Sequence, residues 1–360
     1  MIKVLTVVGA RPQFIKAAIV SHMFKNKKNI REILVHTGQH YDTNMSKIFF
    51  DELEIPTIDY HLGIQSKTHG MQTGEMIIAI EKVLLKEQPD WLLIYGDTNS
   101  TLSAAIAAAK LHIPIAHVEA GLRSYNKKMP EEINRLVADQ LSEVLFAPTT
   151  QSVNNLQHEG YEKSRIIEVG DVMYDAALFY GNKAMQESSI LHKLKIHPQE
   201  YILATIHRAE NTDNHDRLLT IFMALERIHD IKPVIIPLHP RTKKCLESHY
   251  PDLLKNSKIN WILPLSFFDM IMLEKHASLI ITDSGGIQKE AFFYKVPCLT
   301  LRDETEWVET IELGWNQLVK PIDTNHIYDK ALLSLKTRGS DGHYPYGKGN
   351  ASELIAKYFA

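Results

Sequence analysis

The stretch LIITDSGGIQKE, residues 279–290, joins an apolar run to a Ser-Gly-Gly corner and a segment with helical spacing. It predicts a strand that leads into a helix whose N-terminus is left open. Ser284, Gly285 and Gly286 have small or absent side chains, so an anion can approach the N–H groups of the first turn and the positive end of the helix dipole. This pattern is typical of a phosphate-binding turn, although a Gly-Gly pair also occurs in ordinary tight turns.

Glu290 lies about one helical turn beyond Gly286 in the same stretch. Its carboxylate would present a hydrogen-bond acceptor where the sugar diol of a nucleotide can reach it. The stretch therefore predicts a nucleotide site.

Length and composition limit the class of protein. With 360 residues the chain is too long for one ordinary core and suits two α/β domains. The formal charge of −3 gives no electrostatic reason to expect nucleic acid or an anionic membrane as partner. Cys245 and Cys298 form no C-x-x-C pair, which favours a reduced compartment. Because no signal-peptide layout and no apolar stretch of about 20 residues is present, we expect a cytoplasmic protein without a membrane span.

Short apolar runs alternate with helical segments along the whole chain, which predicts parallel sheets covered on both faces. We expect an α/β protein with two doubly wound, Rossmann-like domains: residues 1–170, residues 171–345, and a tail, 346–360, whose helix would pack back on the N-terminal domain. The predicted strands are Val4–Val8, Ile33–Thr37, Trp91–Tyr95, Ile115–Val118, Val144–Ala147, Ile166–Val169, Ile202–Ile206, Val234–Leu238, Trp261–Leu263, Leu279–Thr282 and Cys298–Leu301.

Polar residues capable of chemistry follow the predicted strands. In open α/β sheets, ligands bind at the carboxyl ends of the strands. If the two sheets face each other, these residues converge on one cleft, so we expect the active site in a crevice between the domains. The clusters are Gly9-Ala-Arg11, Gly38-Gln-His40, Gly96-Asp97-Thr98, His117-Val-Glu119, His207-Arg208, His239-Pro-Arg241 and Asp283-Ser284.

Two basic residues flank the first strand-to-helix turn. Arg11 and Lys16 would add positive charge on the diphosphate side of the cleft. For Lys16, a solvated helix face is an equally good interpretation.

Three carboxylates at predicted strand or helix ends are candidates for acid–base chemistry: Asp97, Glu119 and Glu131. Asp97 also fits a helix cap, and Glu131 follows Pro130 at an ordinary helix start. Beside a phosphate site, however, three acids would repel the ligand unless they serve its chemistry. Clustered carboxylates raise some of their pKa values, which suits proton transfer at neutral pH.

Among the 18 histidines, His207 and His239 stand out because each follows an apolar strand and precedes Arg or Pro-Arg. Metal chemistry is not supported: His117-Val-Glu119 resembles the H-x-E of zinc deaminases but lacks a P-C-x-x-C partner, and no H-E-x-x-H occurs. Neither G-x-G-x-x-G nor G-x-x-x-x-G-K-[ST] is present. We therefore expect no redox or phosphoryl-transfer chemistry.

Taken together, the motifs resemble the non-hydrolysing UDP-N-acetylglucosamine 2-epimerases. The resemblance implies a two-domain fold of the glycosyltransferase B type, UDP on the C-terminal domain, and inversion at sugar C2 without metal or any other cofactor. It assigns catalytic positions to Asp97, Glu119, Glu131 and His207, and nucleotide contacts to Arg11, Lys16, His239, Ser284, Gly285, Gly286 and Glu290. The motifs are GARPQFIKAA (9–18), GQH (38–40), GDTNSTL (96–102), HVEAGLRS (117–124), PEEINR (130–135), HRAEN (207–211) and TDSGGIQKEA (282–291).

Three departures from the family pattern concern substrate and regulation. Trp307 follows Glu306 where many members carry Arg, and Pro12-Gln13 stands where they often have Pro-Glu. These features resemble the branch that acts on UDP-2,3-diacetamido-2,3-dideoxy-glucuronate. Some bacterial members bind a second substrate molecule as activator beside the Gln-His turn. Gln39-His40 is kept here, but the Arg-Gln that follows in those members is not evident around residues 66–68.

The resulting prediction is a 2-epimerase of a UDP-linked acetamido sugar, either UDP-N-acetylglucosamine or the diacetamido uronate, in the synthesis of surface-polysaccharide precursors. The family resemblance implies a homodimer. The alternatives are a glycosyltransferase of the same fold, which would need an acceptor site, and a sugar-nucleotide-binding regulator. The three acids favour the epimerase, because a transferase wants one base and a regulator would leave the acids unexplained.

Overall fold

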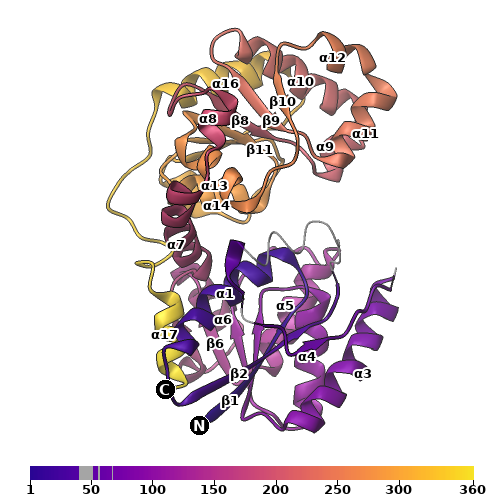
Figure 1. Ribbon diagram of the computed structural model, residues 1–360, viewed down its shortest axis with the longest axis vertical. Coiled ribbons are helices and arrows are strands. Elements are labelled where there is room, and N and C mark those ends of the chain that lie inside the picture. Colours follow the sequence, from indigo (N-terminus) through magenta and orange to yellow (C-terminus); the bar gives the residue numbers. More distant parts are fainter. Residues whose placement is uncertain (40–51, 56, 67) are drawn as a thin grey trace. The chain divides into compact units, whose positions relative to one another are not determined.

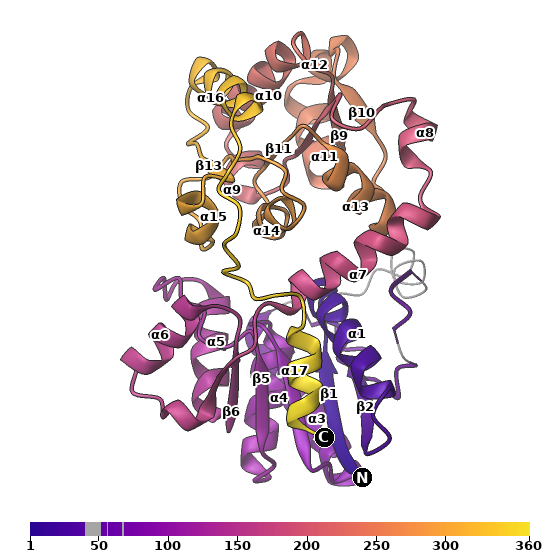
Figure 2. The same ribbon diagram turned by 90° about the vertical axis from the view of Figure 1, so that its left-hand side faces the viewer.

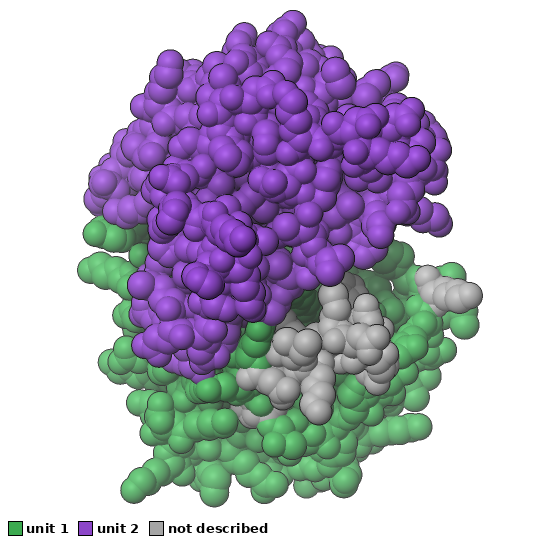
Figure 3. Space-filling view, turned by 45° about the horizontal axis from the view of Figure 1, so that its top comes forward, with its two compact units in different colours: residues 1–176, 344–360 green, residues 177–343 purple. Residues whose placement is uncertain are grey.

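The structure, a computed structural model, describes residues 1–39, 52–55, 57–66 and 68–360. It divides the chain into two compact units, coloured separately in Figure 3. Unit 1 comprises residues 1–176 and 344–360, and unit 2 comprises residues 177–343. Each unit is a parallel sheet covered by helices (Figure 1), as the apolar, non-alternating strands predict.

Unit 1 holds a sheet that has seven strands in the described residues, in the order β3-β2-β1-β4-β5-β6-β7, with every neighbouring pair parallel. On one face, its apolar side chains pack against the helices α3 and α4, which lie side by side (Figure 1). The strands are β1 (Ile2–Val8), β2 (Ile30–His36), β3 (Tyr60–His61), β4 (Trp91–Tyr95), β5 (Ile115–Val118), β6 (Val144–Ala147) and β7 (Ile166–Glu168). The helices are α1 (Arg11–Lys25), α3 (His69–Glu87), α4 (Asn99–Lys110), α5 (Pro130–Leu141), α6 (Thr150–His158), the 3-10 turn η1 (Lys163–Arg165) and α17 (Ala351–Tyr358).

The C-terminal tail belongs to unit 1. Helix α17 lies along α1 (Figure 2), and the Phe359 ring meets Phe24 at 5.8 Å and Trp91 at 5.7 Å between ring centroids. At the start of α17, the Asp175 carboxylate accepts hydrogen bonds from the N–H groups of Ala351 and Ser352 at 3.1 and 2.7 Å. Because Asp175 is attached to α17, the first turn of α7 (Val172–Glu187) belongs to unit 1. Unit 1 therefore extends to residue 176, whereas the predicted boundary lies after residue 170.

Unit 2 contains a parallel sheet of six described strands in the order β10-β9-β8-β11-β12-β13, with a core formed by side chains of the sheet and of α10 and α16. The strands are β8 (Ile202–Thr205), β9 (Val234–Pro237), β10 (Asn260–Ile262), β11 (Leu279–Thr282), β12 (Cys298–Thr300) and β13 (Asn316–Leu318). The helices are α8 (Ile190–Leu194), α9 (Ala209–Thr212), α10 (His215–His229), α11 (Pro240–His249), α12 (Pro251–Asn256), α13 (Phe267–His276), α14 (Gly285–Phe293), α15 (Val308–Glu312) and α16 (Thr324–Lys336).

The predicted strands agree with the structure to within a few residues, and the two doubly wound sheets are confirmed. Two strands escaped prediction, β3 and β13, which lie at the sheet edges. Both are short and rich in polar residues, so neither forms the apolar run that marks a buried strand.

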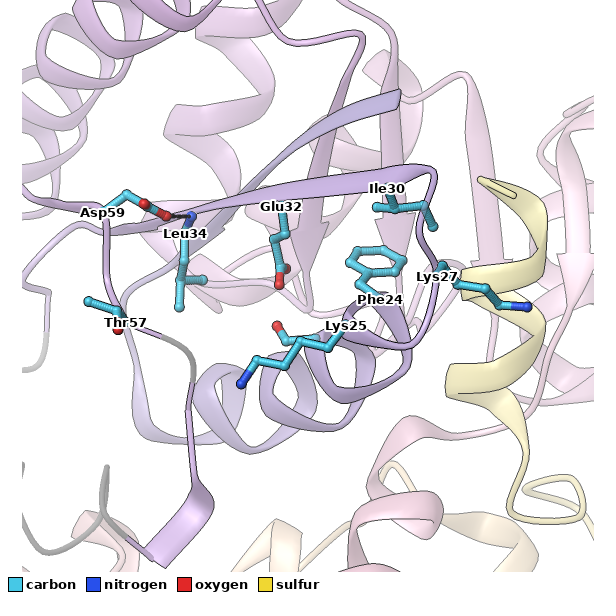
Figure 4. A pocket seen from close by; sticks show the side chains of 9 residues that line it. Phe24, Lys25, Lys27, Ile30, Glu32, Leu34, Thr57 and Asp59 are labelled. Carbon is cyan, nitrogen blue, oxygen red and sulfur yellow. Dashed lines mark hydrogen bonds between the residues drawn. The ribbon is translucent and has the colours of Figure 1, made fainter. Parts of the chain in front are cut away.

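A pocket of about 260 Å³ lies beside β2, next to the last turns of α1 (Figure 4). The Glu32 carboxylate points toward this pocket and accepts a hydrogen bond from the Thr6 hydroxyl at 2.6 Å. Burial raises the pKa of Glu32 above its ordinary value. The pocket is lined from Ile30, at the amino end of β2, to Leu34, so it lies apart from the carboxyl-end loops that carry the predicted site.

Candidate active site

The turn after β1 is fixed by two residues with strict steric or hydrogen-bonding requirements. A Cβ atom on Gly9 would lie 2.0 Å from the Ser100 Oγ, so no larger residue fits there. The Gln13 Oε1 accepts hydrogen bonds from the N–H groups of Gly9 and Ala10, while its Nε2 donates to the Tyr95 carbonyl at 2.7 Å. This donation needs an amide, so Gln13 at a position where relatives often carry Glu locks the β1 turn to the end of β4.

Lys16 lies inside this turn and not on a solvated helix face. Its exposed fraction is 7%, and its ammonium group forms an ion pair with the Glu119 carboxylate. The alternative interpretation of Lys16 as a surface residue is therefore wrong. Arg11, the first residue of α1, is exposed.

Glu119 follows β5 and has a strained backbone. Its φ angle of +73° lies in the left-handed region, which non-glycine residues seldom adopt. Such strain persists where the surrounding structure requires it, often at functional sites. A Cβ atom on Gly96 would lie 3.2 Å from the Glu119 Oε2 and 3.6 Å from the Lys16 Nζ, so the backbone of Gly96 closes one side of this ion pair.

Asp97 follows β4 and pairs with the guanidinium group of Arg135 from α5. Burial raises the pKa of Asp97 above its ordinary value; Arg135 acts against this increase, and the nearby Glu119 carboxylate adds to it. Asp97 is not the cap of α4, because Thr98 occupies that position and its side chain accepts from the Thr101 N–H. Asp97, Glu119 and Lys16 thus form one electrostatically coupled cluster.

The two acids at the start of α5 have different environments. Glu132 is buried and accepts hydrogen bonds from the N–H groups of Ser124 and Tyr125 at 2.9 and 3.0 Å, so it anchors the preceding loop. Glu131 is exposed in the same first turn, one turn before Arg135. Glu131 therefore occupies the helix-start position that the sequence suggested, and Glu132 rather than Glu131 holds the preceding loop.

His117 belongs to a buried network that sequence reasoning missed. Its Nε2 donates to the Gly96 carbonyl at 2.7 Å, and its Nδ1 lies 2.7 Å from the Asp139 carboxylate. Burial acts to raise the pKa of Asp139, but His117 and Arg123 outweigh it and hold that pKa below its ordinary value. Asp139 also accepts from the Gly121 N–H at 3.1 Å, so the network fixes the loop that carries Glu119.

Among the residues that the structure describes, no group of three or more His, Cys, Asp or Glu side chains is placed to hold a metal ion. None of their helices combines the length and apolar character needed to cross a bilayer. His40 of the Gln39-His40 turn lies outside the described residues.

In unit 2, the Ser-Gly-Gly corner opens α14 as predicted. Ser284 is the N-cap residue, and its side chain makes no capping hydrogen bond to the helix. A Cβ atom on Gly285 would lie 2.7 Å from the Glu306 Oε1, whereas one on Gly286 would meet no atom within 4 Å. Gly285 and Gly286 therefore place no side chain over the first-turn N–H groups of α14. Glu290 is half-buried in the second turn of the same helix.

The segment after β8 lies against this corner through Asp283. The buried Asp283 carboxylate accepts hydrogen bonds from the N–H groups of His207 and Arg208 at 3.1 and 3.0 Å. The His207 ring lies 5.3 Å from the His239 ring between centroids. Nδ1 of His239 accepts a hydrogen bond from the Arg241 N–H at 3.2 Å. In the neutral ring Nε2 therefore carries the hydrogen and can donate a hydrogen bond to an anion.

Trp307 lies at the same corner. A Cβ atom on Gly285 would lie 3.8 Å from the Trp307 Nε1 and 3.6 Å from the Arg208 Nη2. The Lys289 ammonium group lies 4.0 Å from the centroid of the Trp307 ring. Arg123 is buried against Asp139 and Glu159, so its charge is not available to a ligand. Arg208, in contrast, lies beside the Ser-Gly-Gly corner.

The chain is similar to known 2-epimerases over nearly its whole length. The chain matches the model of the UDP-N-acetylglucosamine 2-epimerase family over residues 22–360. It is 50% identical, over 99% of both chains, to the UDP-2,3-diacetamido-2,3-dideoxy-D-glucuronate 2-epimerase of Pseudomonas aeruginosa. It is also 50% identical to a UDP-N-acetylglucosamine 2-epimerase homolog of Methanococcus maripaludis, over 99% of this chain and 98% of the relative.

A crystal structure shows the same likeness in three dimensions. The UDP-GlcNAc 2-epimerase of Methanocaldococcus jannaschii, in complex with UDP-GlcNAc and UDP, superposes with a TM-score of 0.89 at 44% identity, over 99% of both chains. The 2-epimerase class predicted from the sequence motifs is confirmed, and the chain belongs to the UDP-N-acetylglucosamine 2-epimerase family.

Proposed function

We propose that this enzyme interconverts the C2 epimers of a UDP-2-acetamido sugar by eliminating UDP and adding it back. The observation that carries the proposal is the coupled cluster of Asp97 and Glu119, each paired with its own cation, at the carboxyl ends of neighbouring strands. UDP would bind unit 2 through the open N-terminus of α14, Glu290 and His239, while the sugar engages the acids of unit 1.

The reaction needs both parts because the C2 proton is too weakly acidic to be removed directly. As the bond from C1 to the diphosphate oxygen breaks, UDP leaves with the electron pair and positive charge grows on the ring. A carboxylate then removes the C2 proton, and the C2–H electrons form the C1–C2 double bond of a 2-acetamidoglucal. Return of a proton to the opposite face of C2, with re-addition of UDP at C1, gives the epimer. Acid and base groups on both faces of C2 are therefore required.

The cations of unit 1 suit this chemistry. The ion pair with Lys16 holds the Glu119 carboxylate in place, so that this acid can act as the base. Asp97, whose pKa is raised, retains a proton to higher pH than an ordinary aspartate and can act as the acid. Glu131 and His207 complete the proposed catalytic groups.

For the sugar we propose UDP-2,3-diacetamido-2,3-dideoxy-glucuronate. Trp307 lies beside Gly285 with 8% of its surface exposed, so the edge of its ring could meet a 3-acetamido group, and Arg208 would supply a cation for the C6 carboxylate. The relative from Pseudomonas aeruginosa, 50% identical over 99% of both chains, is a 2-epimerase of that sugar.

Incubation of the two UDP-sugars separately with the enzyme in heavy water tests both proposals. We expect deuterium at C2 of the product, seen by proton NMR, and a kcat/KM at least about tenfold higher for the diacetamido uronate than for UDP-N-acetylglucosamine. This ratio corresponds to about 1.4 kcal/mol of differential transition-state binding. Epimerisation without solvent label would eliminate the proposed mechanism. Efficient turnover of UDP-N-acetylglucosamine with none of the uronate would refute the role of Trp307.

We also propose that the enzyme is a homodimer paired through α3. Met71, Ile78 and Leu85 recur every seven residues along the exposed side of this helix and are 61%, 57% and 58% exposed. A twofold axis at Ile78 would place Met71 of one copy against Leu85 of the other, which is the self-complementarity of an isologous interface. Gly74, with no atom within 4 Å of an added Cβ, would let the helices approach closely.

Sedimentation measures this directly. We expect a dimer for the unaltered chain and a monomer for Ile78→Glu, because a buried unpaired carboxylate opposes association. Met223→Glu, at a similarly exposed apolar residue of α10, is the control and should remain dimeric. A dimer that survives Ile78→Glu would place the interface elsewhere.

A further inference from the structure

Asp283 joins the phosphate-binding turn to the segment that carries His207. It immediately precedes Ser284 and is fully buried. Both of its carboxylate oxygens lie 3.1 Å from the His207 N–H donor nitrogen, and Oδ2 also accepts from the Arg208 N–H at 3.0 Å and from the Asn211 side chain at 3.1 Å. All of these donors are N–H groups, which match a carboxylate because it only accepts hydrogen bonds.

Asn211 holds the same segment without charge. Its Nδ2 donates to Asp283 and, at 3.0 Å, to the Leu301 carbonyl just beyond β12. The segment is therefore held at the end of β11 by the Asp283 carboxylate and at the end of β12 by the neutral Asn211 amide. These two ties can be separated by mutation.

The charge of Asp283 faces two imidazole rings. Its Oδ1 lies 3.5 Å from the His207 Nδ1, and the His207 and His239 rings lie close enough to repel each other when both are protonated. Burial lowers the pKa of His239 below its ordinary value and His207 lowers it further. Asp283 acts to raise that pKa, and Arg241 acts to lower it. His207 lies in the loop after β8, Asp283 in the loop after β11 and Arg241 in α11, so three different elements bring charge to His239.

When the C1–O bond breaks, negative charge develops on the departing diphosphate, and protonated or N–H-bearing imidazoles are suited to stabilise it. His239, beside His207 and Arg241, loses a proton more readily unless a negative charge compensates. We propose that Asp283 is a positioning residue of the reaction: its carboxylate fixes the His207 segment against the phosphate-binding turn and places a negative charge beside the His207–His239 pair. This inference rests on the proposed function for the role of His207 and His239.

The test compares Asp283→Asn with Asn211→Ala in the full chain. Both changes remove hydrogen bonds from the same segment, but only Asp283→Asn removes the charge. We expect the His239 ring, followed by NMR titration without ligand, to titrate at lower pH in Asp283→Asn and at the unaltered pH in Asn211→Ala. We also expect kcat to fall at least about tenfold in Asp283→Asn, more than KM changes, with the basic limb of the kcat profile moved to lower pH, because a required proton is then lost at lower pH.

Equal His239 titrations in Asp283→Asn and the unaltered chain would overturn the proposal, as would an equal shift in both variants. If Asp283→Asn does not fold, Asp283→Ser, which keeps one acceptor and removes the charge, carries the same expectation. The titration needs no turnover, so it still tests Asp283 if the unaltered chain fails to epimerise, a result that would instead refute the proposed function.

Discussion

Replacing Glu119 by Gln is expected to lower turnover at least about 10²-fold, the usual scale for loss of an acid–base group. The amide keeps the shape of the side chain and most of its hydrogen bonding, but it cannot accept a proton from C2 or balance the Lys16 ammonium group. Asp97→Asn and Glu131→Gln should each cause losses on the same scale. The measurement is kcat for epimerisation, together with a thermal unfolding curve for each variant.

A matched control separates chemistry from charge removal in general. Glu87 forms an ion pair with Lys3 at 3.7 Å, at the opposite end of the sheet from the strand ends that carry the acids. Glu87→Gln should keep turnover within about twofold, because its partners Lys3 and Tyr60 lie away from the proposed catalytic groups. If Glu119→Gln turns over as fast as this control while remaining folded, Glu119 has only a structural role.

The sequence predicted well those features that depend on local pattern. Apolar runs located β4, β5, β6 and β11 with both ends correct, and the small residues Ser284, Gly285 and Gly286 located the open helix end. Both signals arise from constraints within a few neighbouring residues: burial of a strand on both faces, and the absence of side chains over first-turn N–H groups.

Pairings between distant residues could not be predicted in this way. Nothing near Lys16 in sequence indicates that its partner is Glu119, and nothing near His117 indicates Asp139. The same limit applies to Asp283, which looked like a polar residue at a strand end and proved to hold the loop after a different strand. Register between strands, which no single-sequence pattern supplies, sets these contacts.

Adjacent residues with similar chemistry were also hard to rank. Asp97 and Thr98 both fit an N-cap, and only the dihedral angles and the Thr101 N–H show that Thr98 fills it. Glu131 and Glu132 likewise differ by one helical position, which turns one toward solvent and the other into the protein. A rotation of about 100° per residue decides such cases, and it becomes known only when the start of the helix is fixed.

Gly285→Val is expected to weaken UDP binding at least about 10²-fold, or about 2.7 kcal/mol at 25 °C. The substitution acts in two ways. Its Cβ would lie 2.7 Å from the Glu306 Oε1, so the Glu306 carboxylate must move. Its methyl groups would also cover the first-turn N–H groups of α14, which are the donors that a diphosphate needs.

Calorimetry with UDP alone measures the effect without relying on catalysis. Gly70→Val is the matched control, because a Cβ at this α3 position meets no atom within 4 Å and the residue belongs to unit 1. It should leave UDP affinity unchanged, while Gly285→Val should leave unit 1 folded, as judged by amide exchange of β1 and β4. Wild-type UDP affinity in a folded Gly285→Val protein would show that the diphosphate does not bind at this helix end, and the nucleotide site would have to be sought elsewhere.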